Sequence, residues 1–183
     1  LSGISPEEVL LRANENLTEK NDDDMFTTAW IGILEISTGK LVYADAGHEK
    51  LAIFRNGSWE LPRKPNGAVA LASFPQDEYE EIPEKYRFRN HTVMLQPGDA
   101  IVQYTDGVTE ATNVEDDLFG EDRLLQALED APNTSPEVVL SFLRERINSF
   151  VKEAPQFDDI TMLGLLYKGT QREQSENEND GME

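Results

Sequence analysis

The sequence predicts an α+β fold, with antiparallel sheet in the first half of the chain and helices in the second. Two hairpin signals support the first part of this prediction. Residues 26–36 and 41–44 are dense in β-branched and aromatic side chains, and the turn-forming segment Ser37-Thr-Gly-Lys40 lies between them. Asn56-Gly57, the strongest short hairpin signal, separates two further strand-like stretches. The third observation is that apolar residues recur at helical spacing beyond Asp106.

The first half is expected to begin with a helix. Ser5-Pro6-Glu7-Glu8 places a capping hydroxyl, a proline suited to the first helical position and two acids at a helix start. Strands are expected over 51–54 and again from Trp59, on the two sides of the Asn-Gly turn. Further strands are expected over 86–95 and over 100–104, where apolar residues recur.

The second half is expected to hold two helices and a closing strand. A short helix is predicted over 121–130. Ser135-Pro136-Glu137 repeats the earlier start signal, and a longer helix is expected to follow it. Residues 160–167 are typical of a buried strand. The long helix carries an apolar stripe that is expected to pack in the core: Val138, Val139, Phe142, Leu143, Ile147, Phe150 and Val151.

Composition excludes several classes of protein. The 183 residues include no cysteine, so disulfides, cysteine-ligated zinc and thiol catalysis are ruled out. The chain has 36 acidic and 16 basic side chains, a formal charge of -20, and no basic patch. Such a surface repels the phosphate backbone, so no nucleic-acid partner is expected. No apolar stretch approaches the roughly 20 residues of a membrane helix, so we expect a soluble, cytoplasmic protein without membrane contact.

The domain organisation follows from where the charge lies. Residues 1–168 are expected to form one domain, and residues 169–183 a disordered acidic tail with almost nothing to bury. Asn21-Asp-Asp-Asp24 has the acids that begin a calcium-binding loop, but the loop glycine and the glutamate at the twelfth position are missing. A solvated loop is therefore the preferred interpretation of this cluster.

Asp106 is the first candidate metal ligand. It follows an apolar strand and precedes Gly107, so its carboxylate is expected at a strand end. Mg²⁺ and Mn²⁺ prefer oxygen ligands, and a rigid strand end can hold a few carboxylates while positions stay open for water. Gly107 would let the chain turn away without crowding the metal. The alternative, equally supported by this motif alone, is that Asp-Gly is only a turn.

A second acidic pair, Asp158-Asp159, precedes the closing strand. Placing a charged carboxylate against an apolar strand costs desolvation free energy, unless a cation or several hydrogen bonds offset that cost. Neighbouring residues of a strand point to opposite faces, so only one of the two carboxylates is expected to share a site with Asp106. A solvated strand entry is the alternative.

Together these segments resemble a known family, the bacterial PPM-type metal-dependent serine/threonine phosphatases of the sporulation-phosphatase and sigma-regulator branch (stage II sporulation protein E-like). The resemblance runs from about Met25 to Leu165 and covers only the carboxy-terminal part of such a domain. Its landmarks occur in this order: Phe26-Thr27-Thr28, Tyr43-Ala-Asp-Ala-Gly47-His48, Leu95-Gln-Pro-Gly98-Asp99, Tyr104-Thr-Asp106-Gly-Val-Thr-Glu110-Ala111, Phe119-Gly120 and Asp158-Asp-Ile-Thr161.

The resemblance implies a sandwich of two antiparallel sheets flanked by helices, with two Mn²⁺ or Mg²⁺ ions at one end. It implies that Asp106 and Asp158 are ligands of the same metal, together with a bridging Asp from an earlier motif. Asp159, Gly107 and Thr161 are expected to support these ligands without binding the metal themselves.

The implied activity is hydrolysis of phosphoserine or phosphothreonine in a protein. A water bridging the two ions would be acidified and would attack phosphorus in line, with no covalent intermediate and no catalytic side chain beyond the metal ligands. The usual substrate in this branch is a phosphorylated anti-sigma-factor antagonist, so a small phosphoprotein of signal transduction is the expected partner. His48 belongs to a landmark, but a turn-stabilising hydrogen bond is expected for it rather than a metal role.

The sequence departs from the family pattern at its amino terminus. A Gly-Gly-Asp-x-Tyr-Asp segment and a Gly-Asp-x-Ser-Gly-Lys-Gly-like segment are missing, so the bridging ligand and roughly the first third of the domain are absent. Because the chain begins at Leu1, we expect a piece of a longer phosphatase that is inactive by itself. Unpaired sheet edges would favour homodimerisation or strand exchange. The alternative is a non-catalytic PPM-like module that binds a partner.

Overall fold

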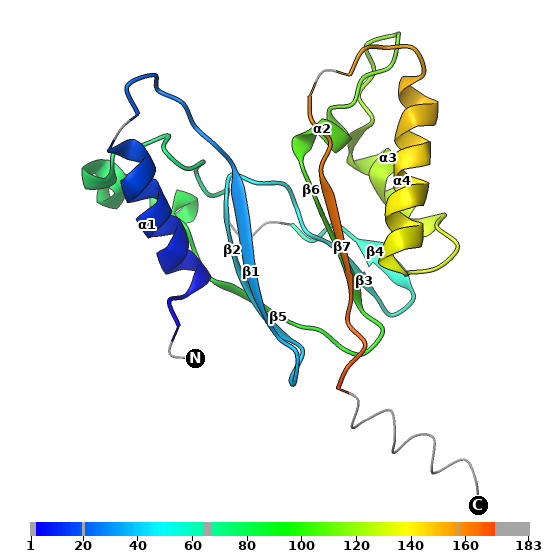
Figure 1. Cartoon of the computed structure of the whole chain (residues 1–183), viewed down its shortest axis with the longest axis horizontal. Helices are drawn as coiled ribbons and strands as arrows, with labels where there is room; N and C mark the ends of the chain where they lie inside the picture. Colours follow the sequence, from blue (N-terminus) through cyan, green and yellow to red (C-terminus); the bar gives the residue numbers. More distant parts are fainter. Residues whose placement is uncertain (1–2, 20, 64–66, 157, 171–183) are drawn as a thin grey trace, which may run out of the picture. The chain divides into compact units, whose positions relative to one another are not determined.

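The structure is a computed structural model that describes residues 3–19, 21–63, 67–156 and 158–170 (Figure 1). Its elements fall into two compact units. Of the described residues, the first unit draws on 3–19, 21–48, 67–95 and 169–170, and the second on 49–63, 96–156 and 158–168. Each unit has its own antiparallel sheet and its own hydrophobic core.

The first unit combines one helix with a three-stranded sheet. Helix α1 (Pro6–Thr18) begins as predicted, because the Ser5 hydroxyl accepts a hydrogen bond from the Glu8 amide at 3.2 Å. The strands are β1 (Ala29–Glu35), β2 (Lys40–Ala46) and β5 (His91–Met94), in the order β1-β2-β5. The register pairs Leu34 with Leu41 and Leu41 with Val93.

Helix α1 packs on one face of this sheet. Leu10 joins Ala44 and Ala46 of β2 in a core that the segment 68–88 completes. That segment contains the 3₁₀ helices η1 (Gln76–Glu81) and η2 (Glu84–Tyr86). The buried Asn14 accepts a hydrogen bond from the Ala72 amide at 2.9 Å, which fixes the segment against the helix.

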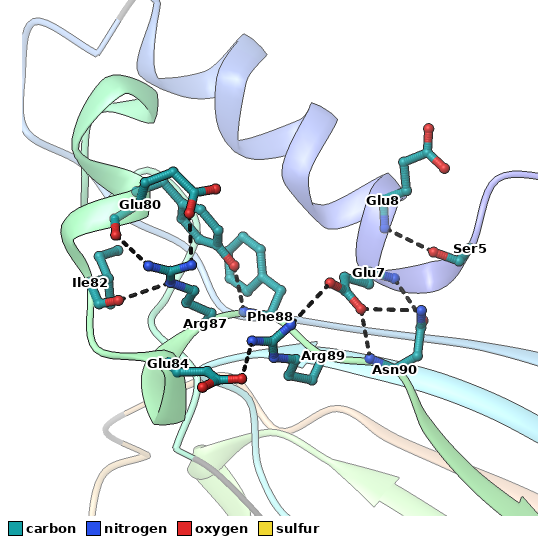
Figure 2. A network of polar contacts seen from close by, with 11 residues as sticks. Ser5, Glu7, Glu8, Glu80, Ile82, Glu84, Arg87, Phe88, Arg89 and Asn90 are labelled. Carbon is teal, nitrogen blue, oxygen red and sulfur yellow. Dashed lines mark hydrogen bonds and ion pairs between the residues drawn. The ribbon is translucent and has the colours of Figure 1, made fainter.

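A polar network joins the start of α1 to the residues that precede β5 (Figure 2). The Glu7 carboxylate accepts hydrogen bonds from the backbone and side-chain amides of Asn90, both at 3.2 Å. Arg89 reaches Glu84 at 2.8 Å and Glu7 at 3.8 Å. Arg87 binds the carboxylate of Glu80 at 2.7 Å. The network therefore holds a long irregular segment in place where no strand forms.

The second unit places helices on a four-stranded sheet of order β4-β3-β6-β7. Every adjacent pair of its strands is antiparallel, and β6 is buried along its whole length. The elements are β3 (Ala52–Arg55), β4 (Ser58–Glu60), β6 (Ala100–Tyr104), α2 (Asp106–Thr109), α3 (Gly120–Glu129), α4 (Pro136–Val151) and β7 (Met162–Leu166).

The core of the second unit lies between the sheet and helices α3 and α4. Leu124 of α3 and Leu143 of α4 are fully buried, and both belong to one cluster with Val102 of β6. Burial of such side chains contributes about 1.5–3 kcal/mol each. Most of the apolar stripe predicted for the long helix is therefore core, although Val138 and Phe142, which are partly buried, lie outside this cluster.

Most predicted elements are confirmed, but several of their boundaries differ from the prediction. The first strand begins at Ala29 and not at residue 26, and the strand expected over 86–95 begins only at His91. The closing strand begins at Met162, two residues later than expected. The acidic tail predicted from residue 169 lies, from residue 171 onward, outside the described residues. No described helix has the length and apolar character that a bilayer-spanning segment requires.

Candidate metal site

Asp106 occupies the first position of the one-turn helix α2, directly after strand β6. Thr105 keeps an extended backbone (φ −86°, ψ 160°), and the chain turns into the helix at Asp106. The Asp106 Oδ1 atom accepts a hydrogen bond from the Gly107 amide at 3.0 Å, and its backbone carbonyl accepts one from the Glu110 amide at 2.8 Å. The Asp106 carboxylate is thus fixed at the end of a fully buried strand, as the sequence predicted.

Thr105 joins this strand end to the second acidic motif. Its hydroxyl donates a hydrogen bond to the Asp159 carbonyl at 2.9 Å and accepts one from the Thr161 amide at 3.0 Å. Its own amide donates to the Thr161 carbonyl, also at 3.0 Å. The β6–β7 pairing, which ends at Tyr104 opposite Met162, is therefore continued by the backbone amide and the side chain of Thr105. As a result the segments that carry Asp106 and Asp158 lie side by side.

Gly107 is required at this junction. A Cβ atom at position 107 would lie 2.5 Å from the Asp159 carbonyl oxygen and 3.0 Å from its carbonyl carbon. Real Cβ atoms do not approach backbone so closely, so any other residue would push the two motifs apart. The sequence predicts that Gly107 leaves room for a metal, whereas in the structure the neighbouring backbone of Asp159 excludes a Cβ atom at this position.

The second motif differs from its predicted geometry. Asp158 and Asp159 lie before β7 and not within a strand, so the argument that their side chains must point to opposite faces does not apply. Both side chains are exposed. The Asp158 Oδ1 atom accepts a hydrogen bond from the Asp159 amide at 2.7 Å, and the Asp158 carbonyl accepts one from Gln156 Nε2 at 2.8 Å. Asp159 and Thr161 take part in the link to Thr105 through their backbone atoms.

A cavity of about 180 Å³ lies beside Asp158. Gly107, Glu110 and Asp158 contribute to its wall, and the apolar side chains of Val151 and Ile160 contribute as well. Asp106 does not line it. The arrangement thus combines a carboxylate at the mouth of a partly apolar hollow with a second carboxylate on the adjoining turn.

The carboxylates of Asp106 and Asp158 are groups of the chemical type that binds divalent cations. Asp106 and Asp158 offer oxygen donors, which Mg²⁺ and Mn²⁺ prefer, and each uses one carboxylate oxygen for a neighbouring amide. They do not fill a six-coordinate sphere. Within residues 3–19, 21–63, 67–156 and 158–170, no three groups among His, Cys, Asp and Glu come together as a metal cage. A cation held here would keep positions for water or for further ligands.

Burial governs the ionisation of Tyr104, the last residue of β6. Desolvation raises the pKa of the Tyr104 phenol, and the charges of Glu49 and Glu121 raise it further. Its hydroxyl has no hydrogen-bond partner among the residues that the structure describes. The phenol therefore stays neutral beside the site.

Two other landmarks meet in the first unit. The Thr28 hydroxyl lies 3.1 Å from His48 Nδ1, and the backbone of Gly47 (φ +68°) turns the chain at the end of β2. His48 thus makes a hydrogen bond, as expected, but its partner Thr28 lies just before strand β1 and not within a turn. The roles of Thr28 and Thr105 do not follow from the sequence patterns above. The available signal was that each threonine stands inside a landmark next to residues that had been assigned a role.

Comparison with known proteins agrees with this organisation. The sequence model of the family Stage II sporulation protein E (SpoIIE) matches residues 1–168. Protein IcfG of Synechocystis sp. is 30% identical over 148 residues, which are 81% of this chain and 22% of that protein. Phosphoserine phosphatase RsbU of Bacillus subtilis is 25% identical over 170 residues, which are 91% of this chain and 47% of that protein. The chain spans less than half the length of both relatives.

A solved structure shares the fold. It is the phosphatase domain of the cell fate determinant SpoIIE from Bacillus subtilis, presoaked with Mn, and it superposes with a TM-score of 0.65. The match covers 93% of this chain and 70% of that domain, at 14% sequence identity. The mixed helix and antiparallel sheet architecture expected from the sequence is thereby confirmed.

Proposed function

The chain belongs to the Stage II sporulation protein E (SpoIIE) family, and on this premise we propose that it is part of a metal-dependent phosphatase that acts on phosphoserine or phosphothreonine in a regulatory protein. Its fold is that of the PPM-type phosphatase domains. The relative RsbU is named a phosphoserine phosphatase, which supports phosphoserine as the substrate group. A phosphorylated anti-sigma-factor antagonist is the kind of protein partner that we propose.

One observation carries this proposal. The Thr105 hydroxyl bridges the Asp159 carbonyl and the Thr161 amide, and it does so directly beside Asp106. A hydroxyl that serves as donor and acceptor between two strand ends fixes their spacing to a few tenths of an ångström. This link brings two acid motifs, more than 50 residues apart in the sequence, to one end of the sheet.

We assign Asp106 and Asp158 as ligands of one Mn²⁺ or Mg²⁺ ion. Each keeps one carboxylate oxygen that accepts no hydrogen bond within the described part of the chain. Such an ion, when bound, lowers the pKa of a coordinated water and polarises a phosphoryl oxygen. The missing acid motifs would supply the remaining protein ligands, including one that bridges to a second ion.

The other residues hold this pair in position. Thr105 fixes the distance between the two segments, and Gly107 allows their close approach. The amides of Gly107 and Asp159 donate to the two carboxylates, which orients them.

The test is hydrolysis of a phosphoserine peptide with Mn²⁺ by the natural protein that contains this chain. We expect Asp106→Asn and Asp158→Asn each to lower kcat by at least about 100-fold, because each removes a charged ligand. Asp122→Asn, an exposed acid on α3 outside the site, is the matched control and should leave kcat unchanged. This chain by itself should be inactive and should bind no second ion tightly.

Two outcomes would overturn the proposal. Equal rates of hydrolysis by the natural protein and by its Asp106→Asn variant would show that Asp106 takes no part in the reaction. A natural protein that binds phosphopeptide but hydrolyses none would support the non-catalytic binding module instead. Cytoplasmic location and homodimerisation through open sheet edges remain predictions, and sedimentation of the purified protein tests the second of them.

A further inference from the structure

A second pocket of the second unit lies between helices α3 and α4, which run side by side (Figure 1). Its volume is about 240 Å³. It shares no lining residue with the cavity beside Asp158. The residues that line it are Phe119, Arg123, Gln126, Arg146, Ser149 and Phe150.

Arg123 is held in place without a carboxylate partner. Its Nη1 atom donates to the backbone carbonyls of Leu118 at 2.8 Å and Phe119 at 3.2 Å. Its guanidinium lies 4.7 Å from the centre of the Phe150 ring, a cation–π contact. No acid lies within ion-pair distance of Arg123 in the described parts of the chain. Its charge is therefore oriented but not neutralised.

Arg146 is oriented from the other side of the pocket. Its Nη2 atom binds Asp130 Oδ2 at 2.9 Å, and its guanidinium lies 5.8 Å from the Phe142 ring centre. Gln126 Nε2 binds the other oxygen of Asp130 at 2.8 Å. Asp130 itself does not line the pocket. Two arginines and one aspartate leave one net positive charge here, on a chain whose formal charge is -20.

The geometry points to a phosphate group as the ligand of this pocket. A guanidinium has five N–H donors, and both arginines keep donors beyond those already used. The Ser149 hydroxyl adds one more donor at the rim. Donors from two helices match the three terminal oxygens of a phosphate better than the two of a carboxylate. Because both arginines are already positioned by their aromatic neighbours, little side-chain entropy is lost on binding.

The phosphate can come from two sources, free inorganic phosphate or a phosphorylated side chain of a protein. Both offer the same oxygens to the arginines, and Arg clusters recognise phosphorylated segments in other proteins. The inference does not depend on the metal site or on hydrolysis.

The experiment is calorimetric titration of the chain with three probes, with EDTA present so that no divalent cation supports hydrolysis. The probes are inorganic phosphate, a phosphoserine peptide and the same peptide with glutamate in place of phosphoserine. We expect saturable binding of phosphate and of the phosphopeptide, and binding of the glutamate peptide weaker by at least about tenfold. Tighter binding of the phosphopeptide than of inorganic phosphate would identify a protein partner as the source, and the reverse order would identify the free ion.

Variants decide whether the pocket is responsible. Arg146→Gln and Arg123→Lys should each weaken phosphate binding by at least about tenfold, the second because lysine keeps the charge but loses the planar fork. Arg144→Gln is the matched control, since Arg144 lies two residues away on the same helix and lines a different hollow. Absence of saturable binding to the unaltered chain would overturn the inference. Equal losses in Arg144→Gln and Arg146→Gln would also overturn it, because they would reveal only general charge attraction. Equal affinity for the glutamate peptide and for the phosphoserine peptide would overturn the inference as well.

Discussion

A side chain at position 107 would collide with the backbone of Asp159, so this single glycine decides how closely the two acid motifs approach. We predict that Gly107→Ala lowers the free energy of unfolding by about 1–3 kcal/mol, because the Cβ forces two packed segments apart. Urea denaturation followed by circular dichroism measures this loss. Gly67→Ala is the control, since a Cβ there meets nothing within 4 Å. A loss in Gly107→Ala no larger than the control's would refute the contact.

Tyr104 makes a second prediction at the scale of one residue. Its buried hydroxyl lacks a partner among the described residues, so Tyr104→Phe should leave the free energy of unfolding unchanged or raise it by about 1 kcal/mol. Burial raises the pKa of Tyr104 in the folded protein. Above the ordinary tyrosine pKa of about 10, the unfolded chain loses the phenolic proton while the folded chain keeps it, so stability falls as the pH rises.

The Tyr104→Phe variant should therefore lose less stability than the unaltered chain between about pH 9 and 11. Thermal melts across this range provide the measurement. Parallel curves for the two proteins would show that Tyr104 ionises alike in the folded and unfolded states.

At the scale of the elements, the turn into β6 depends on a buried ion pair. Asp99 Oδ2 accepts hydrogen bonds from Arg55 Nε at 2.9 Å, from Arg55 Nη2 at 2.6 Å and from the Gln96 amide at 2.9 Å. The Asp99 side chain is only 7% exposed. This geometry explains the Pro-Gly-Asp landmark as the anchor that joins the turn to strand β3.

We predict that Asp99→Ala lowers the free energy of unfolding by about 2–4 kcal/mol, because it removes a buried carboxylate that accepts hydrogen bonds from Arg55 and from the Gln96 amide. Arg12→Ala is the comparison, since Arg12 pairs with Glu8 on the exposed face of α1 and should contribute less than about 0.5 kcal/mol. Chemical denaturation of both variants measures the difference. If they lose similar amounts, the turn is held by its backbone alone.

The elements also show what sequence patterns could predict. Hairpins β1–β2 and β3–β4 and helices α1, α3 and α4 followed from local turn, cap and periodicity signals, because those signals act within a few residues. The structure of the segment 68–90 could not be predicted from such local signals. It is held by contacts with α1, through Asn14 and through the network around Arg89, and these join residues more than 50 positions apart. Helix α2 is a single turn, too short for any periodicity.

The candidate site was predictable in its residues but not in its geometry. Asp106 and Asp158 stand out because acids beside apolar strands need a reason. Their proximity depends on the Thr105 hydroxyl and on the missing Cβ of Gly107. No local sequence pattern predicts either contact. The strand alternation assumed for Asp158 and Asp159 was wrong because β7 begins three residues beyond Asp159.

On the scale of the whole molecule, a formal charge of -20 attracts divalent cations to many places. A metal effect on stability alone would therefore not identify the site. We expect Mn²⁺ to prefer the turn between β6 and α2 over every other acidic segment, including the exposed clusters Asp22–Asp24 and Glu115–Asp117.

The most direct test is paramagnetic broadening of amide signals in the ¹⁵N-labelled chain as Mn²⁺ is added. The signals of Gly107 and Asp159, whose amides bond to the two carboxylates, should broaden at the lowest Mn²⁺ concentrations. Asp158→Asn should abolish this early broadening, and Asp122→Asn should not. Broadening that reaches Asp22–Asp24 and Glu115–Asp117 first, or that is unchanged in Asp158→Asn, would contradict the assignment of Asp106 and Asp158 as ligands of one ion.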